Sequence, residues 1–222
     1  MFRSDDFTSL SLLYHWNSLP RAVPESLHTR EYREHVDGIA LPDSEVTTSE
    51  LDRLIRERRS CRDFESSPLD RHFIGRLLAN AACVPSAGYL HPLEIYAIST
   101  EGISHYNPRD HSTEVRCARP APGVLKSAYL GQPWVEAAGL VVVITSVFRR
   151  NQKKYGPRGY RYALLQAGHA AQNICLTAGE LGLGSVCLGG FDDRKLNRIL
   201  GVNGREEAAL YSVAVGHPLD RP

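Results

Sequence analysis

Residues 160–181 read YRYALLQAGHAAQNICLTAGEL, and this segment constrains the architecture more than any other. Apolar residues recur in it at helical spacing and extend nearly all round the helix, and small residues are frequent. A helix without a polar face is buried in a core or in an oligomer interface. We therefore expect a long buried helix here, with the rest of the chain packed around it.

Strand patterns lie on both sides of this helix. Residues 139–145 contain the apolar run Leu-Val-Val-Val-Ile, which predicts a strand buried on both faces. Residues 103–106 and 114–117 flank the turn sequence Asn-Pro-Arg-Asp, which predicts a hairpin. The other expected strands cover residues 93–99, 185–188 and 208–215. This order indicates one domain of mixed α and β structure without a repeated βαβ unit.

The N-terminal part of the chain has a different pattern. Residues 1–45 hold a short amphipathic segment and spaced prolines, which predicts an arm ahead of a domain over residues 46–222. Thr47 and Glu50 have capping-box spacing and predict the start of a helix that ends at the run 58–62. A second helix is expected over residues 69–83, before Pro85.

Composition excludes several classes of protein. The net charge is +1 with 26 Lys and Arg, of which only four are Lys, so an electrostatic binder of nucleic acid or of a membrane surface is not expected. The N-terminus lacks a signal-peptide core and no apolar run reaches membrane-spanning length, so we expect a soluble cytoplasmic protein. Five widely spaced cysteines without a CxxC pair predict buried free thiols, and neither they nor the histidines predict a metal site.

Two segments could bind a ligand. Arg58, Arg59, Ser60 and Arg62 could surround a phosphate, because guanidinium groups and a hydroxyl donate strong hydrogen bonds to it. The same run could equally be a solvated helix terminus, where cations are favoured. The loop of residues 85–92, Pro-Ser-Ala-Gly-Tyr-Leu-His-Pro, would let backbone approach a flat ligand closely, or it could simply connect a helix to a strand.

Two further motifs have comparable alternatives. Leu188, Gly189 and Gly190 end an expected strand, where the glycine N–H groups could reach a ligand or merely form a tight turn. Lys154 and Tyr155 lie before the buried helix and could exchange protons once burial tunes them, or could lie in a solvated loop. The glycines of residues 179–184 follow a helix and precede a strand, so they indicate a helix C-cap and not a dinucleotide-binding fingerprint.

Taken in order, these motifs resemble the nitroreductase superfamily and, more narrowly, its SagB/McbC-type peptide dehydrogenases, the azoline oxidases. The match runs from about Leu51 to Pro218 and rests on five ordered motifs. Residues 86–92 and 154–162 carry the narrower resemblance. The resemblance implies an α+β fold with a mostly antiparallel sheet flanked by helices, assembled as a homodimer with FMN at the interface.

The resemblance also implies roles for the motif residues. Arg58, Arg59, Ser60 and Arg62 would hold the FMN phosphate, and Leu188, Gly189 and Gly190 would bring N–H groups to the flavin N5 edge. The partner subunit would line the flavin with the loop residues Pro85, Ser86, Ala87, Gly88 and His91, and the long helix would form the dimer core. Lys154 and Tyr155 match the catalytic pair of the azoline oxidases.

The implied reaction is an oxidation of azolines to thiazoles or oxazoles in a peptide or carrier-bound intermediate. A proton leaves the carbon alpha to the carbonyl, a hydride passes to flavin N5, and dioxygen reoxidises the flavin. A cyclodehydratase or synthetase is the expected partner. The alternatives are an NAD(P)H-dependent nitro- or quinone reductase of the same fold and a non-enzymatic scaffold protein. Only residues 219–222 follow Pro218, so a C-terminal arm wrapping the partner is not expected.

Overall fold

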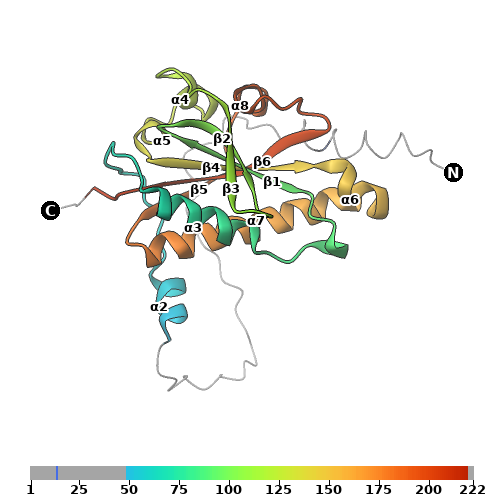
Figure 1. Cartoon of the computed structure of the whole chain (residues 1–222), viewed down its shortest axis with the longest axis horizontal. Coiled ribbons are helices and arrows are strands. Elements are labelled where there is room, and N and C mark those ends of the chain that lie inside the picture. Colours follow the sequence, from blue (N-terminus) through green and yellow to red (C-terminus); the bar gives the residue numbers. More distant parts are fainter. Residues whose placement is uncertain (1–13, 15–48, 220–222) are drawn as a thin grey trace, which may run out of the picture.

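A six-stranded antiparallel sheet lies between two layers of helices (Figure 1). The structure, a computed structural model, describes Tyr14 and residues 49–219. Neighbouring strands follow the order β3-β2-β1-β4-β6-β5, and every pair is antiparallel. The strands are β1 (Leu93–Ser99), β2 (Gly102–Asn107), β3 (Ser112–Cys117), β4 (Leu140–Val147), β5 (Gly184–Leu188) and β6 (Glu207–Gly216). The predicted fold class and all expected strands are confirmed.

The helices divide between the two faces of the sheet (Figure 1). One face is covered by α3 (Arg71–Ala82) and α7 (Arg158–Glu180), and the other by α4 (Val124–Ala128), α5 (Trp134–Ala137) and α8 (Asp193–Leu200). Between β4 and α7 lies α6 (Phe148–Tyr155), while α2 (Glu50–Glu57) extends away from the layers.

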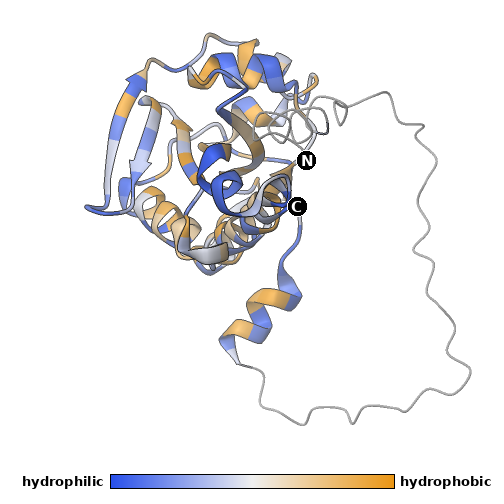
Figure 2. Ribbon diagram, turned by 90° about the vertical axis from the view of Figure 1, so that its right-hand side faces the viewer, coloured by the Kyte–Doolittle hydropathy of each residue, from blue (hydrophilic) through white to orange (hydrophobic). Residues whose placement is uncertain are grey.

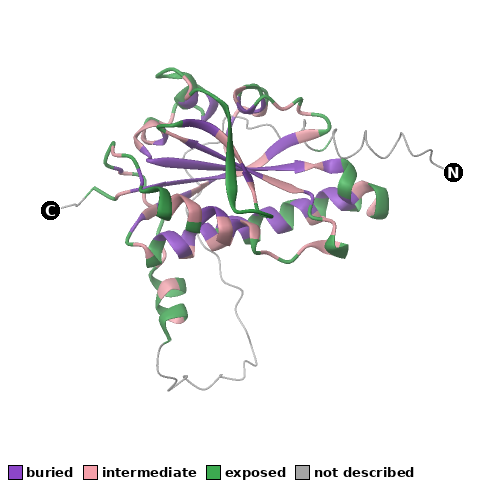
Figure 3. Cartoon of the chain, in the orientation of Figure 1, coloured by how far each residue is buried: buried purple, intermediate pink, exposed green. Residues whose placement is uncertain are grey.

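Strand β4 shows why the sheet is central. Leu140, Val142 and Ile144 pack into the core under α3 and α7, whereas Val141 and Val143 pack into the core on the opposite face. All five side chains are at most 1% exposed. The prediction of a strand buried on both faces is therefore correct, and the sheet interior is buried throughout its middle (Figure 3).

Helix α7 begins two residues earlier than expected and ends one residue earlier. Its alanines at 163, 167, 170 and 171 are buried, which lets the helix approach α3 and the sheet closely. The opposite side carries apolar residues at the surface, because Leu164 is 36% and Leu165 57% exposed. One chain therefore buries only one side of a helix that is apolar nearly all round.

Several local predictions need correction. The capping box that opens α2 is formed by Ser49 and Asp52, not by Thr47 and Glu50, because the Ser49 side chain accepts from Asp52 N while the Asp52 carboxylate accepts from Ser49 N. The prediction that the cysteines are buried is wrong for Cys83 and Cys117, which are exposed. The sequence patterns did not indicate α4, α5 or α6, which are short or lack an apolar stripe. The expected N-terminal arm lies outside the described residues, apart from Tyr14, whose ring packs against Tyr160.

Helix α2 exposes apolar side chains on one side and contacts α7 on another. Leu51 and Ile55 lie on one side of it and are 58% and 50% exposed, although both are apolar (Figure 2). A β-carbon added to Gly179 of α7 would lie 3.6 Å from the side chain of Leu54, so the two residues are close neighbours. This contact places the C-terminal end of α2 against the C-terminal end of α7.

Candidate functional site

The arginine-rich run 58–62 leaves α2 and joins the edge of the sheet. Arg58 is the C-cap of α2, and Ser60 then pairs with Ser185 of β5 in a parallel bridge. Cys61 N donates to the carbonyl oxygen of Ser185 at 2.9 Å. From Ser60 on, the run therefore lies beside β5, whereas Arg58 and Arg59 still belong to the C-terminal end of α2, as the alternative of a solvated helix terminus expected.

The side chains of this run line two hollows, the first two residues one hollow and the last three the other. Arg58 and Arg59 line a cavity of about 260 Å³, together with residues of α7 and β5. Ser60 and Arg62 line a neighbouring cavity of about 440 Å³. The Arg59 guanidinium also donates to the carbonyl of Arg56 at 2.6 Å. The four predicted phosphate ligands therefore lie along one segment but face two adjoining hollows.

The loop of residues 85–92 has an unusual backbone. It contains the 3₁₀ turn η1 (Ala87–Tyr89), in which Gly88 has φ +61°. Tyr89 and His91 also have positive φ values of 58° and 43°, which is uncommon for residues with a side chain. The hydrogen bonds that hold the loop include those from His91 N to Ser86 Oγ at 2.9 Å and from Arg150 to His91 O at 3.0 Å.

Lys154 and Tyr155 occupy the last turn of α6 and converge on this loop. A β-carbon built on Gly88 would lie 2.5 Å from Tyr155 Oη and 2.9 Å from Lys154 Nζ. The Tyr155 ring packs edge-on against Tyr162 of α7 at a centroid distance of 4.9 Å, which orients the phenol. The structure thus brings together two segments that are more than sixty residues apart. Lys154 and Tyr155 lie in a helix and not in a loop, and Lys154 is exposed while Tyr155 is half-buried.

An ion-pair network behind the loop was not found from the sequence. Arg150 of α6 pairs with Glu94 of β1 at 2.5 Å, and Glu94 also contacts His105 of β2 at 2.6 Å. Burial alone would raise the pKa of Glu94, but the hydrogen bond with His105 and the charge of Arg150 hold it below its usual value. Since Arg150 also binds the loop at His91, this network ties the loop to the sheet.

Gln166 is a second residue that sequence reasoning missed. It lies on the buried side of α7 and is 5% exposed, and its Oε1 has no hydrogen-bond partner within the described part of the chain. Gln166 lines a cavity of about 930 Å³ with Tyr89, His91 and Arg150. In the sequence, Gln166 stands out as a polar residue among the alanines of the buried side of α7. A buried acceptor without a donor destabilises the fold, so such a residue suggests that a ligand supplies the donor.

The predicted site residues fall into two groups at opposite ends of α7. Tyr155 packs on Tyr162 near the N-terminal end, whereas Arg58 lines a cavity with Cys175, thirteen residues further along the helix. With a rise of 1.5 Å per residue, that separation is about 20 Å. Gly189 and Gly190 directly follow β5, the strand beside Arg58 and Ser60. Within one chain, the predicted site residues therefore do not meet in one closed pocket.

The residues present fit a flat cofactor with an anionic tail. Gly88 has no side chain, which lets Lys154 and Tyr155 pack against the loop backbone and present their polar ends beside it, where a planar ring could meet them. The unpaired Oε1 of Gln166 would accept from an N–H or O–H group. At the other end, Arg58 and Arg59 provide guanidinium donors of the kind that bind phosphate.

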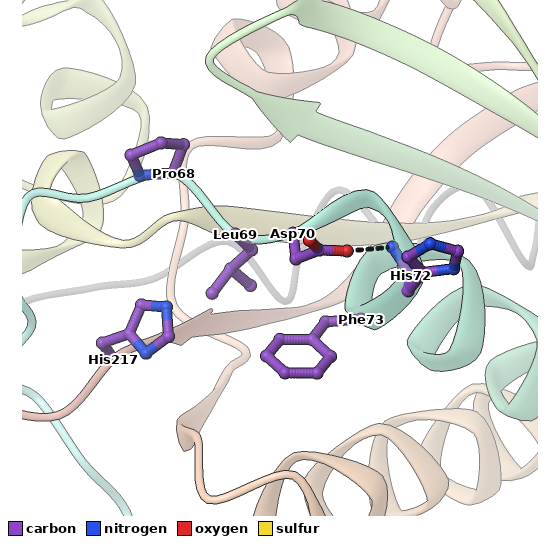
Figure 4. Close-up of a pocket in the computed structure, with 6 residues that line it drawn as sticks. All are labelled: Pro68, Leu69, Asp70, His72, Phe73 and His217. Atoms are coloured by element: carbon purple, nitrogen blue, oxygen red, sulfur yellow. Dashed lines mark hydrogen bonds between the residues drawn. The ribbon is translucent and has the colours of Figure 1, made fainter.

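A further hollow of about 660 Å³ lies at the N-terminal end of α3 (Figure 4). Leu69 and Phe73 form its apolar wall and His217 faces them (Figure 4). The only carboxylate in its lining, that of Asp70, accepts from His72 N and caps α3. This hollow contains no predicted site residue.

Within the described part of the chain, no helix is long and apolar enough to span a membrane.

Comparison with known proteins identifies the family. The model of the nitroreductase family matches residues 55–217. A candidate nitroreductase of Methanocaldococcus jannaschii is 34% identical over 197 residues, which cover 82% of this chain and 97% of that relative. The microcin B17-processing protein McbC of Escherichia coli is 27% identical over 142 residues, which cover 57% of this chain and 50% of McbC.

Solved structures show the same fold. The chain matches the E. coli microcin synthetase McbBCD complex with bound truncated pro-MccB17 at a TM-score of 0.80, with 22% identity and coverage of 97% of this chain and 94% of the matched chain. It also matches a candidate nitroreductase of Desulfovibrio desulfuricans in complex with FMN at a TM-score of 0.60, with 20% identity and coverage of 80% and 94%. The chain belongs to the nitroreductase family of oxidoreductases and, within that superfamily, is related to the SagB/McbC type.

Proposed function

We propose that this oxidoreductase is an FMN-dependent dehydrogenase that aromatises azolines to thiazoles or oxazoles in a peptide or a carrier-bound intermediate. One observation carries the proposal: Lys154 Nζ and Tyr155 Oη converge on Gly88, a residue of the loop that has no side chain. This is the pair that the resemblance to azoline oxidases marks as catalytic. The sequence relation to McbC supports the same assignment.

Lys154 and Tyr155 would handle the proton that leaves the carbon alpha to the azoline carbonyl. Two groups on one helical turn, aimed at one point, can divide this work: one receives the proton and the other donates a hydrogen bond to the receiving atom. Positioned acid–base groups contribute about 10²- to 10⁴-fold to a rate. Tyr162 would hold the Tyr155 ring in place through its edge-on contact.

FMN, when bound, would supply the acceptor for the hydride. We assign its phosphate to Arg58, Arg59, Ser60 and Arg62, which line the two adjoining hollows beside β5. The backbone of Leu188, Gly189 and Gly190 would face the ring edge. Across the ring would lie the loop of the second subunit, with Pro85, Ser86, Ala87, Gly88 and His91, and the Gln166 acceptor would lie behind it.

We infer a homodimer because the two groups lie about 20 Å apart along α7 in one chain. A second copy, placed with its α7 against the exposed Leu164 and Leu165, would bury the apolar side that one chain leaves open. Each site would then take its arginine-rich run from one subunit and its Lys154–Tyr155 pair from the other. The match to the McbBCD complex supports a synthetase or cyclodehydratase as a further partner.

The reaction is tested directly with a synthetic thiazoline peptide. Incubated with the flavin-loaded enzyme in air, the peptide should lose about 2 Da per ring, because oxidation removes one proton and one hydride. Lys154→Ala and Tyr155→Phe should lower the rate by about 10²-fold or more while leaving the flavin bound. Lys153→Ala, the exposed neighbour on α6, is the matched control and should retain the rate. No mass loss with the unaltered enzyme would refute the assignment.

The second candidate function is an NAD(P)H-dependent nitro- or quinone reductase. The observation that favours it is the relative from M. jannaschii, which matches more of this chain at higher identity than McbC does. A reductase must take hydride from a nicotinamide, so NADPH would bleach the flavin absorbance within a turnover. A flavin that stays oxidised with NADPH but is reduced by the thiazoline peptide supports the dehydrogenase.

A further inference from the structure

Two cysteines from different elements meet beneath the arginine-rich run. Cys175 lies on the buried side of α7 and Cys187 on β5, and their sulfur atoms are 3.5 Å apart. All five cysteines of the chain are free thiols. Cys83 and Cys117 are more exposed, but each lies in a different part of the fold. Cys175 and Cys187 are therefore placed to react with each other.

The surroundings favour a negative charge on one of the two sulfurs. The hydrogen bond from Cys175, a hydrogen bond from Tyr211 and the positive charge of Arg58 together lower the pKa of Cys187 to about 6, against the effect of burial. The same contact with Cys187 and burial raise the pKa of Cys175. The contact therefore favours a thiolate beside a thiol, and the charge of Arg58 and the hydrogen bond from Tyr211 favour Cys187 as the thiolate.

The two cysteines also differ in their exposure to solvent. Cys187 is partly exposed, whereas Cys175 is 3% exposed. The cavity of about 260 Å³ that Arg58 and Arg59 line adjoins the pair on the side of Cys175, so the reach of a solute to Cys187 rests on the partial exposure of Cys187 itself. A thiolate that is reachable, next to a thiol that is shielded, is the arrangement of an attacking and a resolving cysteine.

We propose that Cys187 and Cys175 are a peroxide-reactive pair that closes to a reversible disulfide between β5 and α7. The Cys187 thiolate attacks one oxygen of a hydroperoxide, the O–O bond breaks, and the departing oxygen takes a proton to leave as water or an alcohol. The Cys175 sulfur then displaces hydroxide from the Cys187 sulfenic acid, and its proton leaves with that hydroxide as water. Two thiols are oxidised and one peroxide is reduced.

The geometry requires little movement for this closure. A disulfide has an S–S distance of about 2.05 Å, so the sulfurs must approach by about 1.5 Å, which side-chain rotation can provide. The bond would fix the C-terminal half of α7 to β5, directly under Arg58 and beside Ser185, the residue that pairs with Ser60. A redox-dependent crosslink would thus lie beneath the proposed phosphate ligands.

Thiol chemistry tests this without any substrate. In full-length protein carrying Cys83→Ser and Cys117→Ser, hydrogen peroxide should remove two of the three remaining thiols and lower the mass by about 2 Da, reversibly with dithiothreitol. Peptide mapping should join Cys175 to Cys187. In the same background, Cys175→Ser should instead leave a sulfenic acid on Cys187 that dimedone traps, whereas Cys187→Ser should leave Cys175 unreacted.

Retention of all three thiols, a bridge that includes Cys61, or equal dimedone labelling of Cys61 and Cys187 would overturn the proposal. Cys61 is a fair internal comparison, because it is also partly exposed, and its sulfur contacts a backbone carbonyl instead of a second sulfur. Neither azoline oxidation nor bound flavin enters these measurements. Their failure is therefore distinguishable from failure of the proposed function.

Discussion

At the scale of single residues, Gly88 is where one substitution should have the largest specific effect. An added β-carbon would come within 2.5 Å of Tyr155 Oη and 2.9 Å of Lys154 Nζ, at a φ of +61°. Gly88→Ala should therefore displace the pair and lower azoline turnover by an order of magnitude or more, with a stability loss of about 1 kcal/mol. Enzyme kinetics and urea unfolding measure the two effects.

Gly131→Ala is the control variant: it adds the same backbone strain as Gly88→Ala without displacing Lys154 and Tyr155. Gly131 has φ +86°, and no atom lies within 4 Å of its added β-carbon. This variant should lose comparable stability but keep its activity. Equal loss of activity in both variants would contradict the role given to Gly88.

Glu94 gives a prediction for pH. Its pKa is held below the ordinary value of 4.5, so the folded state favours the charged carboxylate. The stabilisation is therefore complete above pH 4.5 and is lost as the pH falls through the lower folded-state value. Urea unfolding measures the free energy of unfolding of the unaltered protein and of Glu94→Gln. The difference between the two should be largest at neutral pH and shrink in acid. A difference that stays constant into acid would contradict the ion pairs with Arg150 and His105.

At the scale of elements, sequence periodicity identified those whose burial has a regular pattern. The five-residue apolar run predicted the buried strand β4, which is confirmed, and the row of small residues predicted the long helix α7, which is buried on one side in this chain. Helix α6 was missed because its sequence, FRRNQKKY, has no apolar stripe, and its buried contacts include a polar residue, Asn151, which donates to Gly159 O. The capping box was misplaced by two residues because Thr47, Thr48 and Ser49 all have suitable side chains.

The exposed side of α7 yields a prediction about assembly. Leu165 is 57% exposed on a helix that is apolar nearly all round, and a homodimer would cover it. Leu165→Arg should place a charge in the interface and convert dimers to monomers in analytical ultracentrifugation. Leu130→Arg is the matched control, because Leu130 is 53% exposed on the opposite face of the sheet and should leave the assembly unchanged. A monomeric unaltered protein, or dissociation by both variants, would contradict this interface.

At the scale of the whole molecule, the sequence predicted the fold class better than the site. Ordered motifs led to Arg58, Gly88, Lys154 and Gly190 without any coordinates, because each motif is local. Their arrangement in space is not local, since it depends on which end of α7 each segment meets. Gln166 and the Glu94 network escaped because a single polar residue in a helix or strand carries no distinctive spacing.

The central claim is that each site is completed by two copies of the chain, and subunit complementation tests it most directly. Lys154→Ala and Arg58→Ala each remove one half of the site, so either homodimer should be inactive in azoline oxidation. In a mixed dimer, one of the two sites would receive both intact halves. Co-expressed variants should therefore recover about a quarter of the unaltered activity when subunits pair at random. A mixture as inactive as its parents, under conditions in which mixed dimers are isolated, would contradict the account.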